Sequence, residues 1–162
     1  MRKANYDKFP STKLTGMLVQ GWDSIISMLK EKMDARKVLA VDLYTGVYEE
    51  EVLDAFSKEF SGRVMNVRDL MKPEKEIQTL TERFMTEDVL FGYVTNLRLE
   101  DYLDADKVAA ARKQISEAKE TIVIIGTGAA VVAPQDAMVV YADMARWEIQ
   151  QRFRRHEVKA LG

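Results

Sequence analysis

Short runs of apolar residues alternate along the chain with longer amphipathic stretches. Val38–Leu43 is apolar on both faces apart from Asp42, as expected for a strand inside a parallel sheet. Residues 121–125 (TIVII) form the clearest strand of the chain, and residues 63–67 and 137–141 predict two more. The pattern therefore predicts at least four strands, because each apolar run is shorter than a typical helix.

Apolar residues at helical spacing fill the intervals between these runs. They predict helices over residues 22–34, from Glu49 onward, over 73–84, over 103–119 and over 143–159. Strands that alternate with helices predict an α/β fold, a three-layer open sheet that is mostly parallel. We expect Val41, Ile124 and Val139 in the core, with ligands at the edge where the strands end.

The remaining segments are less regular. Residues 1–16 are polar and predict an extended lead-in to one domain that spans residues 1–162. Residues 17–20 predict a short strand, and residues 88–97 predict either another short strand or an extended excursion.

Composition excludes several classes of function. The 162 residues carry a net charge of −2, which does not indicate binding to nucleic acid or to an anionic membrane. There is no cysteine and one histidine, so thiolate zinc sites and histidine-rich metal sites are excluded. The N-terminus has no apolar core, and residues 121–134 are too short to cross a bilayer, so we expect a cytoplasmic protein without a membrane partner.

Residues 38–56 form a strand, a turn at Gly46 and a helix that opens on three glutamates. This arrangement is used by phosphate-binding α/β domains, where backbone amides and the helix dipole face an anion. Here Glu49–Glu51 oppose a phosphate, and no lysine follows Gly46, so the pattern G-x-x-x-x-G-K-[ST] is not met. Thr45 and Gly46 are candidates for a ligand turn that accepts a cation or a sugar hydroxyl; the alternative is a tight turn whose acidic residues stabilise the helix.

Two further groups are candidates for the same cleft. Gly126, Thr127 and Gly128 follow the best strand, where small residues allow close approach of a ligand or close packing of the chain. Asp42 ends a buried strand, so its carboxylate either pairs with a cation or faces the cleft.

The last helix is rich in arginine. Arg152 and Arg155 are three residues apart and share a helix face, whereas Arg154 points elsewhere. Guanidinium groups match phosphate oxygens, so Arg152 and Arg155 are candidates for a phosphate clamp. The alternative is a solvated or salt-bridged helix face.

The order of these elements resembles a P-loop kinase of the uridine kinase type. The resemblance covers most of residues 36–156: the strand, turn and helix of residues 38–56, then two strands, Asp143 and the arginine-rich helix. It implies a kinase-like fold. The family's phosphate-binding glycine, lysine and threonine are replaced here by Tyr48, Glu49 and Glu50, so the phosphate loop is degenerate.

The sequence also resembles the N-terminal region of longer bacterial class I mannose-6-phosphate isomerases. The similar segments are residues 126–130 (GTGAA) and 141–150 (YADMARWEIQ). The histidine and glutamate metal ligands of the isomerase are not present. This resemblance implies an accessory domain in carbohydrate metabolism, with an isomerase domain as its partner.

Two functions follow as expectations. The first is a non-catalytic kinase-like accessory domain that binds a sugar phosphate or a nucleotide. The alternative is an active nucleoside or sugar kinase with an unconventional phosphate loop, which implies ATP and Mg²⁺ as cofactors. Phosphoryl transfer needs positive charge around the γ-phosphate, and the turn at Gly46 supplies negative charge instead.

Overall fold

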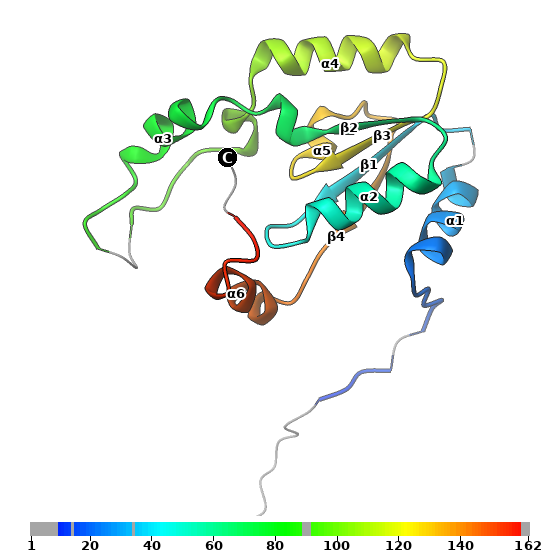
Figure 1. Ribbon diagram of the computed structural model, residues 1–162, viewed down its shortest axis with the longest axis horizontal. Helices are drawn as coiled ribbons and strands as arrows, with labels where there is room; N and C mark the ends of the chain where they lie inside the picture. The colour runs from blue at the N-terminus through cyan, green and yellow to red at the C-terminus, as the bar shows by residue number, and fades with distance from the viewer. Residues whose placement is uncertain (1–9, 14, 34, 89–91, 160–162) are drawn as a thin grey trace, which may run out of the picture.

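Four parallel strands form the centre of the computed structural model, which describes residues 10–13, 15–33, 35–88 and 92–159 (Figure 1). The strands lie in the order β2-β3-β1-β4, so the first strand of the chain is flanked by the third and fourth. Their bounds are β1 Val38–Leu43, β2 Arg63–Asn66, β3 Ile122–Gly126 and β4 Met138–Ala142. The predicted α/β class and the parallel arrangement of the strands beginning near Val38, Thr121 and Ala137 are confirmed.

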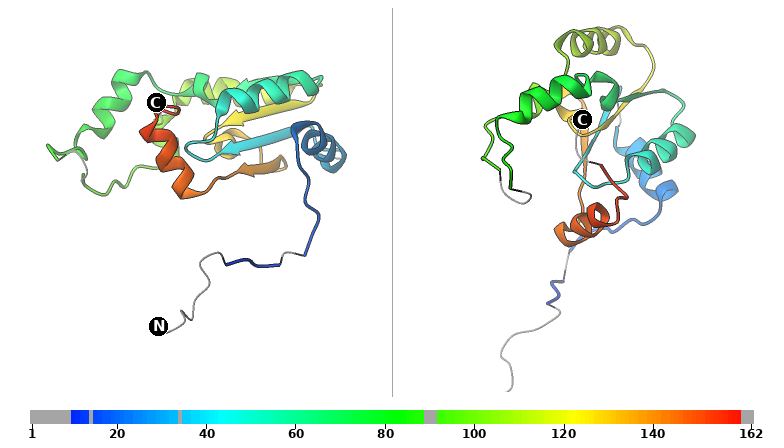
Figure 2. Two further views of the ribbon diagram at one scale, coloured as in Figure 1. Left: turned by 60° about the horizontal axis from the view of Figure 1, so that its bottom comes forward. Right: turned by 60° about the vertical axis from the view of Figure 1, so that its left-hand side comes forward.

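Helices cover both faces of the sheet, with α1 and α2 on one side and α4 and α5 on the other (Figures 1 and 2). The bounds are α1 Trp22–Met33, α2 Glu49–Glu59, α3 Glu74–Glu82, α4 Ala105–Glu117, α5 Ala129–Val132 and α6 Arg146–Arg154, with two 3₁₀ turns, η1 Val67–Leu70 and η2 Leu99–Tyr102. Asp104 caps α4 by accepting from the amides of Asp106 and Lys107. This cap satisfies two of the amides that a helix leaves unpaired at its start.

The alternation of side chains along β1 divides the core in two. Val38 and Ala40 pack with α4 and α5, whereas Leu39, Val41 and Leu43 pack with α1 and α2. All five residues of β3 are buried, which explains its continuous apolar run. Burying one isoleucine or valine side chain stabilises the fold by roughly 1.5–3 kcal/mol.

One core prediction is wrong. Val41 and Ile124 are buried, but Val139 is 54% exposed. Because β4 lies at the edge of the sheet, Val139 projects from a surface that the core helices leave open. A sequence pattern cannot distinguish an edge strand of this kind from a central one.

Three other boundaries differ from the sequence pattern. Residues 17–20 form no strand, and Met17 and Leu18 are exposed. Residues 89–91 lie outside the described residues, and the other residues of 88–97 form no strand. The last helix spans only Arg146–Arg154, because the chain turns at His156, which has a φ of 56°.

The connection between β2 and α4 projects to one side of the sheet (Figure 1). Its two ends are held together, since Met71 and Leu103 form an antiparallel bridge and the Asp104 amide donates to the Leu70 carbonyl at 2.9 Å. Among the described residues, no helix is long and apolar enough to cross a membrane.

Candidate functional site

A cleft of about 720 Å³ opens at the carboxyl ends of β1 and β3. β1 leads into α2 on one face of the sheet and β3 leads into α5 on the other, so the chain diverges between these neighbouring strands. Ligands of open α/β sheets bind at such a divergence. Four segments line the cleft: residues 43–51 with Leu53; Asn66, Arg68 and Met71; Gly126 and Thr127; and residues 157–159.

The turn from β1 into α2 forms one wall of the cleft. Gly46 has a φ of 93°, and a Cβ at this position would lie 3.2 Å from two carbons of Ile149 on α6. Glycine is therefore needed both for the backbone and for the close approach of α6. The amides of Thr45, Gly46 and Tyr48 donate no hydrogen bond within the described part of the chain; Thr45 is exposed and Tyr48 half-buried, whereas Gly46 is buried.

The charges around the turn are mainly negative. Glu49 forms an ion pair with Arg68 at 3.0 Å, and Glu51 accepts from the Trp22 indole at 2.9 Å. Glu50 is exposed and contacts no described donor. With Glu157 these carboxylates outnumber the cations Arg68 and Lys159 that line the same cleft, so the cleft favours neutral or cationic groups over phosphate.

Asp42 does not line the cleft. Its carboxylate accepts from the Gly128 amide at 3.1 Å and the Ala130 amide at 2.9 Å, at the start of α5. The cost of a half-buried carboxylate is thus offset by two backbone donors rather than by an arginine or lysine.

The segment 126–128 packs tightly against its neighbours. The Thr127 hydroxyl donates to the Leu43 carbonyl at 2.9 Å, which joins the ends of β3 and β1. A Cβ on Gly126 would lie 2.9 Å from the Cβ of Val67. Gly126 and Thr127 line the cleft, whereas the Gly128 amide is already paired with Asp42.

Arg152 is turned inward from α6, with its side chain only 15% exposed. Its Nη1 donates to the Gly46 carbonyl at 2.7 Å, and its Nε donates to Glu148 at 3.1 Å. The guanidinium lies 3.7 Å from the centre of the Tyr48 ring, a cation–π contact. Arg152 therefore fastens α6 to the β1–α2 turn, and these contacts favour the salt-bridged alternative over a phosphate clamp.

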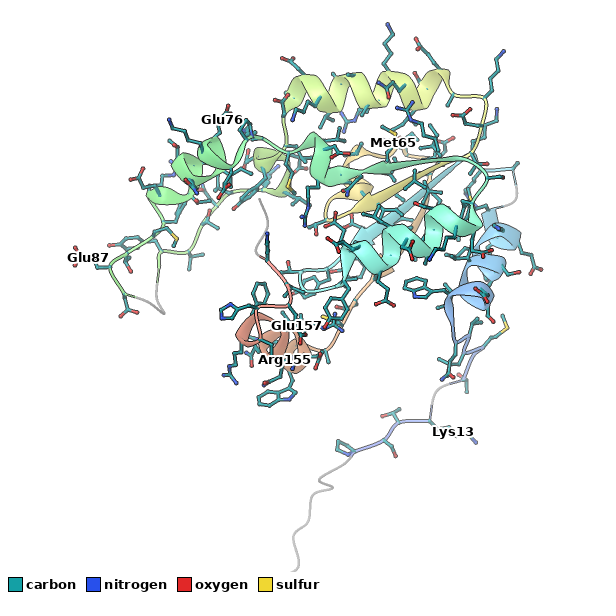
Figure 3. All side chains as sticks on the ribbon, viewed as in Figure 1. Lys13, Met65, Glu76, Glu87, Arg155 and Glu157 are labelled. Atoms are coloured by element: carbon teal, nitrogen blue, oxygen red, sulfur yellow. The ribbon has the colours of Figure 1, made fainter. Side chains whose placement is uncertain are left out.

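Arg155 and Glu157 lie side by side at the end of α6 (Figure 3). Arg155 donates to both oxygens of Glu157, at 2.6 and 2.9 Å, and to Glu148 at 3.2 Å. The Tyr48 hydroxyl donates to Glu157 at 2.6 Å. Arg155 does not line the cleft. With Tyr48, Glu148, Arg152 and Glu157 it forms a cluster that we call the α6 latch.

The latch shifts the pKa values of its members. The hydrogen bonds from Arg155 and then Tyr48 lower the pKa of Glu157 from 4.5 to about 2. The hydrogen bond to Glu157 raises the pKa of Tyr48 above 10.0. The contribution of Glu157 to stability is complete above pH 4.5 and is lost as the pH falls towards 2, whereas that of Tyr48 is lost as the pH rises above 10.

We expect the substitution Glu157→Gln to lower the melting temperature at pH 7 and to lose its effect in acid. The difference from the unchanged protein should shrink between pH 4.5 and 2, because both proteins then lack the carboxylate charge. Thermal melts across this range measure it, with Glu76→Gln on α3 as the control. A difference that stays constant down to pH 2.5 would contradict the latch.

Half of the predicted site residues meet at the cleft. Thr45, Gly46, Gly126 and Thr127 line it, whereas Asp42, Gly128, Arg152 and Arg155 lie outside the lining. The sequence pattern missed Asn66, Arg68 and Lys159 as lining residues. The sequence could have indicated Asn66 and Arg68, since they lie at the carboxyl end of the predicted strand 63–67, which ends at the same edge of the sheet.

Within the described residues, no group of three histidine, cysteine, aspartate or glutamate side chains is placed to hold a metal ion. Two of the glutamates of the cleft are paired with other groups, Glu49 with Arg68 and Glu51 with the Trp22 indole.

The chain belongs to the family whose model matches most of its length. Residues 21–162 match the family model "Domain of unknown function (DUF8485)". No curated protein and no solved structure matches the chain. The match covers every strand and helix described above.

Proposed function

We propose that this protein is a non-catalytic, kinase-like α/β domain whose cleft binds a small polyhydroxylated ligand such as a sugar. The observation that carries the proposal is that the arginines of α6 donate to other groups of the protein. Arg152 and Arg155 donate to Gly46, Glu148 and Glu157, while Glu49–Glu51 occupy the start of α2. Phosphoryl transfer requires cations around the transferred group, and the cleft has a surplus of carboxylates.

The cleft offers the groups that recognise hydroxyls. The unpaired amide of the exposed Thr45 is a donor, and the Glu50 carboxylate is an acceptor without a described partner. The side chains of Leu43, Leu53 and Met71 add an apolar surface. A few polar groups on an apolar wall are typical of small-molecule sites.

The accessory role rests on the resemblance to the N-terminal region of mannose-6-phosphate isomerase proteins. In this proposal the domain presents or senses a sugar for an isomerase partner and does not act on it. Arg68 and Lys159, the two cations of the cleft lining, are the groups that would contact a phosphate if the bound sugar carries one.

The alternative is an active nucleoside or sugar kinase. The observation that favours it is the cleft's position, at the turn between β1 and α2 where kinases of this type bind ATP phosphates. In that case Arg68 and Lys159 would have to replace the missing lysine. ATP with Mg²⁺ is the ligand that distinguishes the two functions.

We expect neutral sugars to raise the melting temperature and millimolar ATP with Mg²⁺ to leave it unchanged. A ligand present at ten times its Kd stabilises the native state by about 1.4 kcal/mol, which corresponds to roughly 3–6 °C for a domain of this size. A thermal-shift panel of sugars, sugar phosphates and nucleotides, with and without Mg²⁺, measures the effect.

The matched variants are Glu50→Gln in the cleft and Glu76→Gln on α3. Loss of a charged acceptor costs about 1.5–3 kcal/mol, so Glu50→Gln should weaken sugar binding about ten- to a hundredfold, and Glu76→Gln should not. A shift with ATP and Mg²⁺ would favour the kinase. A panel without any shift would refute the sugar site.

A further inference from the structure

The strand β4 leaves one row of backbone groups without a partner in the described sheet. The Tyr44 amide donates to the Ala142 carbonyl at 2.9 Å, so Ala142 faces β1, and by alternation so do Val140 and Met138. The N–H and C=O groups of Val139 and Tyr141 therefore point away from β1, to the outer side of the edge strand.

The side chains of the same two residues are also exposed. Val139 is 54% and Tyr141 58% exposed, while Met138, Val140 and Ala142 pack into the core beneath α1 and α2. The helix on the other face, α5, packs against β1 and β3. Tyr44 lies beside Tyr141, with ring centres 6.3 Å apart, and extends the exposed apolar surface that Val139 and Tyr141 form.

The described residues give this edge none of the usual protection against pairing. Edge strands are normally blocked by a charge, a proline or a bulge, yet residues 138–142 (MVVYA) contain no charge and no proline. The opposite edge differs, since β2 is four residues long and begins with Arg63. The open edge of β4 is thus a template for a further strand.

We propose that a second copy of this chain pairs with β4 in antiparallel orientation, with the two-fold axis at Val140. In this register Val139 faces Tyr141 of the second copy, and by symmetry Tyr141 faces its Val139. Both residues direct their backbone groups outward, as the hydrogen-bonded positions of an antiparallel pair require. The two pairs form four hydrogen bonds and join the two sheets into one.

The side chains favour a second copy over an unrelated strand. Each pair places a β-branched residue opposite an aromatic residue, a combination that stabilises antiparallel strands. The acidic residues that flank β4 do not oppose each other, since Asp143 faces Ala137 of the second copy. A two-fold interface needs this self-complementarity, and the sequence 137–143 provides it.

The chain has no cysteine, so single cysteines can report the register. Val140 lies opposite Val140 of the second copy at a non-hydrogen-bonded position, where the two Cα atoms are about 4.5 Å apart. This distance is within the range that a disulfide spans. Val139 and Val139 of the second copy are offset by two residues along the strands. Their Cα atoms are therefore more than about 7 Å apart, too far for a disulfide. Val140→Cys should therefore cross-link, although Val139 is the more exposed residue.

The experiment oxidises both variants and follows the product on a non-reducing gel. We expect Val140→Cys to yield a dimer of twice the 18.5 kDa chain, with at least a tenfold lower yield for Val139→Cys. Equal yields, or a higher yield for Val139→Cys, would overturn the proposed register.

Sedimentation of the unchanged protein provides an independent test that no cysteine variant affects. The mass should rise towards the dimer with concentration; Val139→Lys should abolish the rise and Val139→Thr should retain it, since only lysine places a charge on the edge. A monomer at every concentration would refute the dimer. Circular dichroism melts would establish that each variant is folded.

Discussion

Replacing Asp42 by alanine is expected to lower the melting temperature by about 6–24 °C, the largest effect of any substitution proposed for this chain. The Asp42 carboxylate accepts two hydrogen bonds, from the amides of Gly128 and Ala130. Hydrogen bonds to charged groups contribute about 1.5–3 kcal/mol each, so loss of both should lower the free energy of unfolding by about 3–6 kcal/mol. Thermal and urea melts measure it.

Asp42→Asn is the matched control. Its amide oxygen can still accept from one of the two backbone donors, so about half of the loss should remain. If Asp42→Ala melted within 1 °C of the unchanged protein but no longer bound a ligand, the carboxylate would instead face the cleft, and the observed contacts would not describe its role.

Replacing Arg152 by alanine is expected to cost about 2–3 kcal/mol and 4–12 °C in melting temperature. The variant loses the bond to the Gly46 carbonyl at 2.7 Å and the contact with the Tyr48 ring at 3.7 Å. Because the side chain is only 15% exposed, solvent screens these contacts little. The pairing with Glu148 adds a smaller amount, since Glu148 is 42% exposed.

Arg154→Ala on the same helix is the control, because the Arg154 side chain is exposed and forms no hydrogen bond or ion pair with any described residue. It should melt within about 1 °C of the unchanged protein. If the Arg152→Ala protein kept its melting temperature but bound sugar phosphates about tenfold more weakly, Arg152 would act as a phosphate clamp instead.

The Asp42 and Arg152 substitutions both test whether a charged candidate residue holds the fold together or binds a ligand. If Asp42 and Arg152 are both structural, the cleft keeps only Arg68 and Lys159 as cations, and a non-catalytic binding domain is the consistent interpretation. The latch also holds one wall of the cleft in place, since Arg152 donates to the carbonyl of Gly46.

The α/β class and the position of most elements could be predicted from the sequence because their signals are local. Continuous apolar runs identify buried strands, and apolar spacing of three and four identifies helices. The glycine turn at Gly46 and the acidic start of α2 are likewise visible within a few residues, and so is the edge of the sheet where the cleft opens.

Only the tertiary structure decided which candidate residues meet in the cleft. Asp42 pairs with amides 86 and 88 residues further along the chain, and Arg152 donates to a carbonyl 106 residues away. Val139 is exposed because the strand order places β4 at an edge. Such contacts depend on how the crossovers bring distant segments together, and neither periodicity nor composition contains that information.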